Sequence, residues 1–335
     1  MTIKIFSPQN HQIFQRNDFN KSNVIFSGFV SNEINEIIIE VSDKENEQCL
    51  TSVTIDIMQD KSFFSSVEIP SGGWYCANVC MVKDGQKILV DSRVFAVGEV
   101  FLAAGQSNST NYGEERSQQT SGMVACFAHN HWELARDPLP GAHDVSEGGS
   151  PWLFFGDYLY EKLGVPIGIA ITGHGGTQVK EWLPDDEFCG QCEEKRGLFN
   201  WMMLRLQQLG VRGCRAVLWH QGESDAGNGT AKELYYERLR NIITTCREQC
   251  GWYIPWFVAL VSYRSPDSCL HISVREAQKK ICDDAIAFLG PDTDSLVDEN
   301  RDLQGAGVHF SLKGLENHGQ MWGTKIEKWL KNHKI

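Results

Sequence analysis

The sequence predicts an α/β fold in which helices cover both sides of a parallel sheet, preceded by a small all-β sandwich. Short β-rich runs follow one another over the first 96 residues, whereas apolar strand-like runs alternate with helix-like stretches from about residue 97. The length of 335 residues also favours one large domain plus a smaller one. The change of pattern places a boundary near residues 95–98, which gives regions at 1–96 and 97–335.

The N-terminal region reads as a series of antiparallel strands. Polar or glycine-containing turns such as PSGG and KDGQ separate its runs, and strands at this spacing are typical of a β-sandwich. The expected strands are 23–30, 36–42, 50–58, 63–69, 74–82 and 87–97. We expect this region to brace the larger one, with glycan binding and dimerisation as the alternatives.

The larger region alternates between buried strands and helices. Its apolar runs are nearly continuous, as in parallel strands that are covered on both faces. The expected strands are 100–104, 166–172, 215–219, 255–262 and 285–290, and the expected helices are 152–163, 198–209, 231–246 and 272–283. A last helix should begin after Ser311, which is a good N-cap, because Leu315, Trp322 and Ile326 then share one apolar face.

Composition excludes several classes of partner. The net charge of −12 argues against nucleic acid, which selects for an excess of Lys and Arg. No run approaches the roughly 18 consecutive apolar residues of a membrane-spanning helix. The first residues lack the apolar run of a secretion signal, so either the chain stays in the cell or a signal has been removed, and we expect a cytoplasmic protein.

The cysteines do not predict a metal or redox site. The eleven cysteines lack the regular spacing of a disulfide framework, which favours free thiols. Cys189 and Cys192 form a CxxC pair, but a zinc site needs two further ligands and no second CxxC or HxxxH pair is present. We therefore expect neither a metal nor a cofactor.

Three polar, glycine-rich segments directly follow predicted strands, at 105–108, 173–177 and 220–225. In an open α/β sheet, ligands bind beyond the carboxyl ends of the strands, so these segments should meet at the functional edge. Ser107 in the first segment suits a nucleophile presented at a tight turn, which would need an adjacent base. A serine turn that caps the next segment is the alternative.

Other candidates lie in or near the same segments. The glycine pair 175–176 permits the close backbone approach of an oxyanion hole, or is a simple turn. Gln221 offers a side-chain donor, and Glu223 offers a carboxylate that orders the loop. Trp182 is the best-placed tryptophan for stacking on a sugar ring, although core packing is the usual fate of this residue. His309 precedes the last helix, where a loop would bring it over the sheet edge, although a lone histidine is more often structural.

Taken together, these segments resemble a known family. VGEVFLAAGQSN (97–108), GHGGTQVKEWLP (173–184), LWHQGESDA (218–226) and GVHFS (307–311) are similar, in this order, to four blocks of one branch of the SGNH (GDSL) hydrolases. That branch comprises sialate O-acetylesterases and acetylxylan esterases, and the match covers about residues 96–335. The resemblance implies a flavodoxin-like three-layer α/β/α fold, no metal, and hydrolysis of acetyl esters on carbohydrates.

The resemblance also assigns roles to individual residues. Ser107 matches the nucleophile and His309 matches the general base. The amides of Ser107 and Gly176, together with the Gln221 side chain, match the oxyanion-hole positions. Glu223 matches an acid that braces the active-site loops.

One position departs from the family pattern. Such enzymes usually carry an aspartate three residues before the histidine, where this chain has Ala306. The acid would orient the imidazole and stabilise its charged form. Asp302 or Glu299 is expected to replace it, or a backbone carbonyl does so and leaves a Ser–His dyad, or the chain is a weakened variant.

These observations predict a serine esterase that hydrolyses O-acetyl esters on sialic acid or another glycan, through an acetyl-enzyme on Ser107. The expected partner is a small-molecule or oligosaccharide acetyl ester, with no nucleic acid and no membrane. One alternative is a carbohydrate-binding protein that has kept the esterase fold with weakened catalysis. Another is an SGNH esterase or thioesterase that acts on a substrate other than a sugar.

Overall fold

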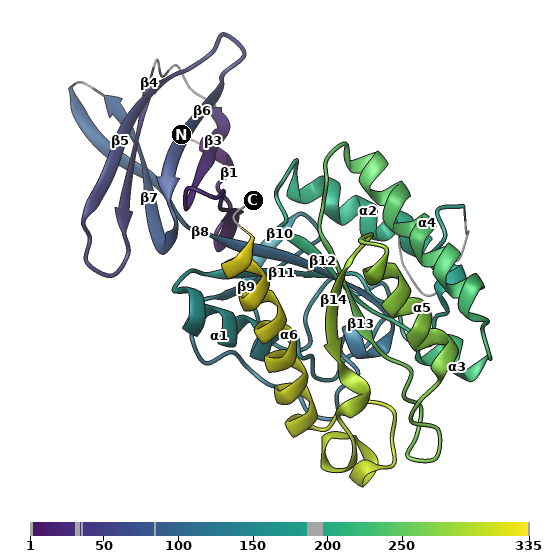
Figure 1. The fold of residues 1–335 in the computed structure, drawn as a ribbon. Helices are drawn as coiled ribbons and strands as arrows, with labels where there is room; N and C mark the ends of the chain where they lie inside the picture. The colour runs from purple at the N-terminus through teal and green to yellow at the C-terminus, as the bar shows by residue number, and fades with distance from the viewer. Residues whose placement is uncertain (1–2, 31–33, 35, 84, 186–196, 334–335) are drawn as a thin grey trace.

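The protein has two parts, a β-rich N-terminal part and a larger part in which helices flank a sheet (Figure 1). The computed structural model describes residues 3–30, 34, 36–83, 85–185 and 197–333. The CxxC pair at 189 and 192 lies outside these described residues. No helix in the described ranges is both long and apolar enough to cross a membrane.

Two sheets form the N-terminal part. One has the order β1 (Ile3–Ser7), β3 (Lys21–Val30) and β6 (Ser62–Pro70), with antiparallel pairs. The other joins β5 (Cys49–Asp56), β4 (Glu36–Asp43), β7 (Gly72–Lys83) and β8 (Gln86–Gly105), with β2 (Gln12–Gln15) parallel to β8. Alternate side chains such as Phe26 of β3 and Ile39 of β4 share one buried cluster, as in a sandwich.

Strand β8 passes from the first part into the second without a break. Its first half pairs with β7, and its second half lies between two strands of the larger sheet. The expected boundary at 95–98 is therefore the middle of a strand rather than a linker. Buried Glu99 reinforces this junction, because Arg16 and Arg215 both lie 2.7 Å from its carboxylate oxygens.

The larger sheet has the order β10 (His131–Leu134), β9 (Val124–Ala128), β11 (Ile167–Ile171), β8, β12 (Ala216–His220), β13 (Trp256–Leu260) and β14 (Phe288–Asp292). All pairs are parallel except β10 with β9. Without the edge hairpin of β9 and β10, the strand order is 2-1-3-4-5, which is the flavodoxin-like order. The order reverses between β8 and β12, and ligands bind at such a point.

Helices cover both faces of this sheet, which confirms the predicted three layers. α1 (Trp152–Leu163) and α6 (Leu312–Asn332) pack on one face, and α2 (Leu198–Leu209), α4 (Lys232–Cys250) and α5 (Ile272–Asp283) pack on the other. Ser311 is the N-cap of α6, as predicted, and its hydroxyl accepts the Gly314 amide at 3.2 Å.

Candidate active site

The loops after β8, β11 and β12 are bound to one another at the carboxyl edge of the sheet. The Gln106 amide donates to the His220 carbonyl at 3.0 Å, and the His174 amide donates to the Gly105 carbonyl at 3.0 Å. Gly105 has a φ of 134°, and a Cβ there would overlap the His220 carbonyl oxygen. Only glycine permits this close approach, so the first and third segments meet as the strand order predicts.

Ser107 opens a short 3₁₀ turn that runs from Ser107 to Ser109. The Ser107 carbonyl holds the turn by accepting the amide of Thr110 at 2.9 Å and its hydroxyl at 3.0 Å. The Ser107 side chain is not the cap of this turn, because the N-cap residue is Gln106. The serine hydroxyl is therefore not the group that caps this turn.

Asn108 connects the serine turn to two distant segments. Its Nδ2 donates to Oε1 of Glu223 at 2.9 Å and to the Val308 carbonyl at 3.2 Å. Ser107 directly precedes Asn108 in the chain, and His309 directly follows Val308. One side chain thus holds the first, third and fourth sequence segments together across 200 residues.

Glu223 is a brace within this cluster. It begins α3 (Glu223–Gly227), is 2% exposed, and also accepts the Gly222 amide at 3.1 Å. Burial raises the pKa of Glu223 to about 7. Its partners are Asn108, the loop backbone and His220, whose Nδ1 lies 3.8 Å from Oε1, so of the three candidate acids it is not the one beside His309.

Asp302 is the acid that lies beside His309. Oδ2 of Asp302 is 3.6 Å from Nδ1 of the imidazole, and Oδ1 accepts the His309 amide at 3.1 Å. The Asp302 amide donates back to the His309 carbonyl at 3.0 Å. Gly307 makes this pairing possible, because a Cβ there would overlap the Asp302 carboxylate.

The two other positions considered for the acid are elsewhere. Glu299 is exposed and forms an ion pair with Lys313. Ala306 ends the short 3₁₀ turn Leu303–Gly305, and the chain then returns to His309 opposite Asp302. The carboxylate is therefore supplied from seven residues before the histidine instead of three.

The electrostatics around His309 suit a base. Burial lowers the pKa of the imidazole below its usual 6.5, while the charge of Asp302 acts to raise it. The ring is consequently neutral at pH 7, with Nδ1 directed at the carboxylate. A neutral imidazole with one nitrogen oriented in this way can accept a proton on the other nitrogen.

The loop after β11 presents backbone amides beside the serine turn. Oδ2 of Asp144 accepts the Gly175 amide at 2.6 Å, and a Cβ on Gly175 would collide with the Tyr112 hydroxyl. Gly176 has a φ of 73° and faces open space. No backbone acceptor in the described part of the chain binds the amide of Ser107 or of Gly176.

Gln221 does not hold a free donor in this arrangement. The side chain is fully buried, and Nε2 donates to the Thr177 carbonyl at 3.0 Å and to Oδ2 of Asp225 at 2.7 Å. Both amide hydrogens are therefore used, and the expected oxyanion-hole role of Gln221 is not supported by this geometry. These bonds instead hold the loop after β11 against the loop after β12. Asp225 adds to this brace by accepting the Val179 amide at 2.7 Å.

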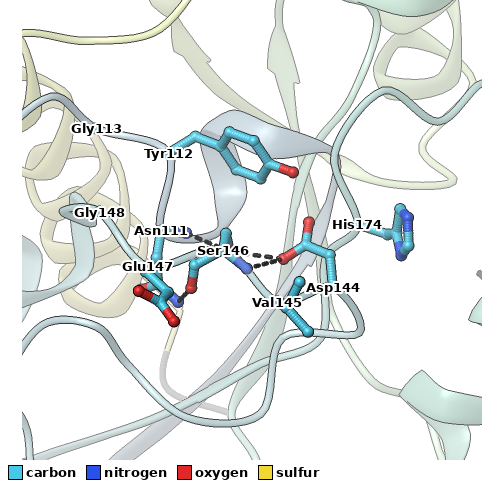
Figure 2. Close-up of a pocket in the computed structure, with 9 residues that line it drawn as sticks. All are labelled: Asn111, Tyr112, Gly113, Asp144, Val145, Ser146, Glu147, Gly148 and His174. Atoms are coloured by element: carbon cyan, nitrogen blue, oxygen red, sulfur yellow. Dashed lines mark hydrogen bonds between the residues drawn. The ribbon is translucent and has the colours of Figure 1, made fainter. Parts of the chain in front are cut away.

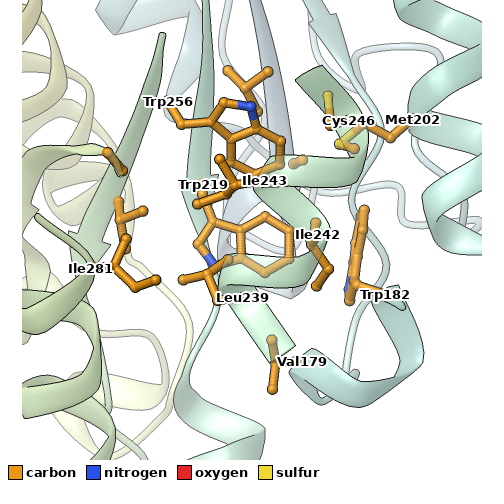
Figure 3. Packing of buried hydrophobic residues seen from close by; sticks show 14 of the residues in the cluster. Val179, Trp182, Met202, Trp219, Leu239, Ile242, Ile243, Cys246, Trp256 and Ile281 are labelled. Carbon is orange, nitrogen blue, oxygen red and sulfur yellow. The ribbon is translucent and has the colours of Figure 1, made fainter. Parts of the chain in front are cut away.

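Trp182, the candidate for stacking on a sugar ring, is a core residue instead. The ring is fully buried and packs edge-on against Trp219 with centroids 5.1 Å apart, and Nε1 donates to Oγ1 of Thr177 (Figure 3). A capping box between Gln178 and Glu181 shapes the turn Val179–Trp182 that directs the ring inward. Position in the sequence places this tryptophan near the site but does not reveal which way the ring points.

Replacing Trp182 by Ala should therefore reduce stability rather than substrate affinity. Removal of a buried tryptophan leaves a large cavity, so we expect a loss of about 3–5 kcal/mol in the free energy of unfolding. Urea denaturation measures this loss. Tyr253→Ala is the control, because Tyr253 is 59% exposed and its removal should cost about 1 kcal/mol or less. A Trp182→Ala variant of unchanged stability would contradict the buried position.

A pocket of about 480 Å³ lies beside this cluster (Figure 2). It is lined by Asn111, Tyr112, Gly113, Asp144, Val145, Ser146, Glu147, Gly148 and His174. The Tyr112 ring connects the pocket to the base, because it lies against the His309 imidazole with centroids 5.0 Å apart and planes inclined by 32°. Burial and then the Asp144 carboxylate raise the pKa of the Tyr112 phenol, which therefore stays protonated.

None of these lining residues was singled out as a site residue from the sequence. Tyr112 and His174 lie just after and within the segments already singled out, so their position could have identified them. Asp144 lies in a loop without a motif, and only its bonds to Gly175 and Ser146 show its importance. Among the described residues, no group of three or more His, Cys, Asp or Glu is placed to hold a metal.

Comparison with known proteins identifies the family of the larger part of the chain. A family model described as carbohydrate esterase, sialic acid-specific acetylesterase, matches residues 97–328. A probable carbohydrate esterase of Arabidopsis thaliana is 26% identical over 175 residues, which are 44% of this chain and 63% of that protein. The matched stretch thus spans less than two thirds of that relative.

Two solved structures share the fold. A carbohydrate acetylesterase from Xanthomonas citri superposes with a TM-score of 0.61 at 20% identity, covering 99% of this chain and 76% of its own. A protein of Arabidopsis thaliana gives 0.53 at 18% identity, covering 71% of this chain and 99% of its own. Because the family model covers more than half of the residues, this chain belongs to the carbohydrate esterase family described as sialic acid-specific acetylesterases.

Proposed function

We propose that this protein is a serine esterase that removes acetyl groups from sugars through an acetyl-enzyme on Ser107. The observation that carries the proposal is the double hydrogen bond of Asn108, which joins the serine turn to Glu223 and to the carbonyl next to His309. These two bonds support a position of Ser107 and His309 at one edge of the sheet, as the proposal requires. Membership of a carbohydrate esterase family supports the same reaction.

In the proposed mechanism, His309 takes the Ser107 proton while the serine oxygen attacks the acetyl carbonyl. Asp302 holds Nδ1 of the imidazole and stabilises its positive charge. The amides of Ser107 and Gly176 bind the tetrahedral oxyanion. As the bond to the sugar oxygen breaks, the His309 imidazolium gives its proton to that oxygen, which leaves as the sugar hydroxyl. Water, activated by the same imidazole, releases acetate from Ser107. No step requires a metal or a cofactor.

The position of Asp302 favours one of the alternatives left open at Ala306. A carboxylate at the imidazole nitrogen supports a complete Ser–His–Asp triad over a dyad or a weakened enzyme. Gln221 has a positioning role in this proposal, since its amide holds the glycine loop through Thr177. The oxyanion hole then consists of backbone amides, and the Gln221 side chain keeps the loop that carries Gly176 in position.

Covalent labelling tests the proposal directly. A fluorophosphonate reacts readily only with an activated serine, so the wild-type protein should incorporate one label and Ser107→Ala should incorporate none. Intact-mass and peptide mass spectrometry measure this. A folded wild-type protein that resists labelling would favour the alternative of a carbohydrate-binding protein without catalysis.

Substrate class is tested by a second measurement. The protein should hydrolyse O-acetylated sugars, measured as acetate release, faster than long-chain acyl esters or thioesters at the same concentration. The polar lining of the pocket beside Tyr112 supports this order. Faster turnover of the acyl esters or thioesters would favour the non-sugar alternative.

A further inference from the structure

We propose that the pocket beside Tyr112 selects acetylated sugars that carry no carboxylate, and that Glu147 sets this selectivity against anionic sugars. The inference rests on the proposed esterase function and names the substrate class of the same site. The family description refers to sialic acid, which is an anionic sugar, so this chain would differ from that description in its preferred substrate.

The pocket is in the right place to hold the sugar. Tyr112 contacts the His309 imidazole on one side and lines the pocket on the other, and His174 lies next to the glycine pair of the second loop. The side chain of Tyr112 is 36% exposed, so its ring is available to a ligand. A volume of about 480 Å³ falls in the range of about 300–1,000 Å³ that is usual for small-molecule sites.

The charged groups that line the pocket are negative. Asp144 and Glu147 are carboxylates, and no Lys or Arg is among the lining residues. His174 adds no positive charge at pH 7, because burial lowers the pKa of its imidazole. A sugar carboxylate in this space would meet like charges, and like-charge contacts are a common basis of discrimination between ligands.

Arg301 and Arg116 are both bound to other groups. Arg301 is buried, and its guanidinium donates to the carbonyls of Leu296 and Val308. Arg116 donates through Nε to the Glu147 carbonyl, and its Nη2 is 3.4 Å from the Glu147 carboxylate. The charges of Arg116 and Glu147 partly offset each other, and Asp144 leaves the charged groups at the pocket net negative.

The two acids have different roles. Asp144 already accepts the Gly175 amide and both the amide and hydroxyl of Ser146, so it is part of the framework. The Glu147 side chain is 81% exposed and has only the long contact with Arg116. Glu147 is thus free to accept hydroxyl groups of a neutral sugar and to repel a carboxylate.

The test compares kcat/KM for methyl 6-O-acetyl-glucoside, which is neutral, with kcat/KM for 9-O-acetyl-N-acetylneuraminic acid. The wild-type protein should prefer the neutral sugar by about tenfold or more, and Glu147→Lys should reduce this preference by about tenfold. Glu248→Lys is the matched control, because it makes the same change of charge at an exposed position on α4. It should keep the wild-type ratio.

Salt gives a second readout that needs no variant. Raising ionic strength from about 0.05 M to about 0.5 M screens exposed charges, so the preference of the wild-type protein for the neutral sugar should shrink. Equal or faster turnover of the sialic acid ester at low salt, or an unchanged ratio in Glu147→Lys, would overturn the proposal. Hydrolysis of p-nitrophenyl acetate by the wild-type protein but not by Ser107→Ala shows that the esterase function stands even then. Without that hydrolysis, both proposals fall.

Discussion

Ser107→Ala should lower kcat for p-nitrophenyl acetate by about 10⁶-fold, as expected when the nucleophile of a serine hydrolase is removed. The hydroxyl takes no part in the cap of its own turn, which the Ser107 carbonyl holds instead. The variant should therefore fold normally, with an unfolding midpoint close to that of the wild-type protein. Stopped assays of p-nitrophenol release, with circular dichroism on the same sample, measure both quantities.

Ser109→Ala is the matched control for this change. Ser109 lies in the same turn and is also buried, but its hydroxyl donates to the Gln106 carbonyl at 2.7 Å. That carbonyl keeps the Ser109 amide as a second donor, so the substitution should cost about 1 kcal/mol of stability and leave kcat within about tenfold. Comparable losses in the two variants, or activity retained by Ser107→Ala, would assign the nucleophile elsewhere.

Asp302→Asn should lower kcat by about 10⁴-fold, because the imidazole loses the carboxylate that orients it and stabilises its charge. The variant should also shift the pH profile. His309 must be neutral to act, so activity falls as pH drops through the pKa of the imidazole, which burial places below 6.5. The Asp302 charge raises that pKa, so its removal should move the fall in activity to lower pH.

Glu299→Gln is the control for the second prediction. Glu299 is the other acid near His309 in sequence, but it is exposed and paired with Lys313. This variant should keep the wild-type rate and the wild-type pH profile. A pH profile of Asp302→Asn that coincides with the wild type, despite lower activity, would show that Asp302 acts only through the backbone of its loop.

Local patterns in the sequence were enough to predict most elements of the fold. α1, α2 and α5 begin and end at the predicted residues, because each combines an apolar face with clear breaks at both ends. The strands of the larger sheet were recognisable as continuous apolar runs. The short strands β1 and β2 were not predicted, since runs of five and four residues carry too little periodicity.

The sequence also indicated which segments meet at one edge of the sheet. Three glycine-rich segments after strands, together with the resemblance to a known family, led to Ser107 and His309, and Asn108 binds Glu223 and the Val308 carbonyl in the neighbouring segments. The sequence named Asp302 and Glu299 as candidates for the acid but could not choose between them. Asp302 reaches His309 because the chain folds back after a short turn, and neither the spacing nor the residue type reveals that return.

The burial of individual side chains was also not predictable from the sequence. Trp182 and Gln221 lie in or next to the segments that were expected at the functional edge. Both are nevertheless fully buried and hold other parts of the protein in place. Tyr112, Asp144 and Glu147 line the pocket, although no motif marks them.

Secondary structure and the order of the functional segments thus follow from periodicities and residue types within about ten to twenty neighbouring positions, which a sequence records directly. The direction of a ring, the partner of a carboxylate and the charges around a pocket depend on contacts between segments up to 200 residues apart. Such contacts form because packing brings distant surfaces together. Their free energy depends on both residues of a pair that are not neighbours in the chain, so it cannot be read from either residue alone.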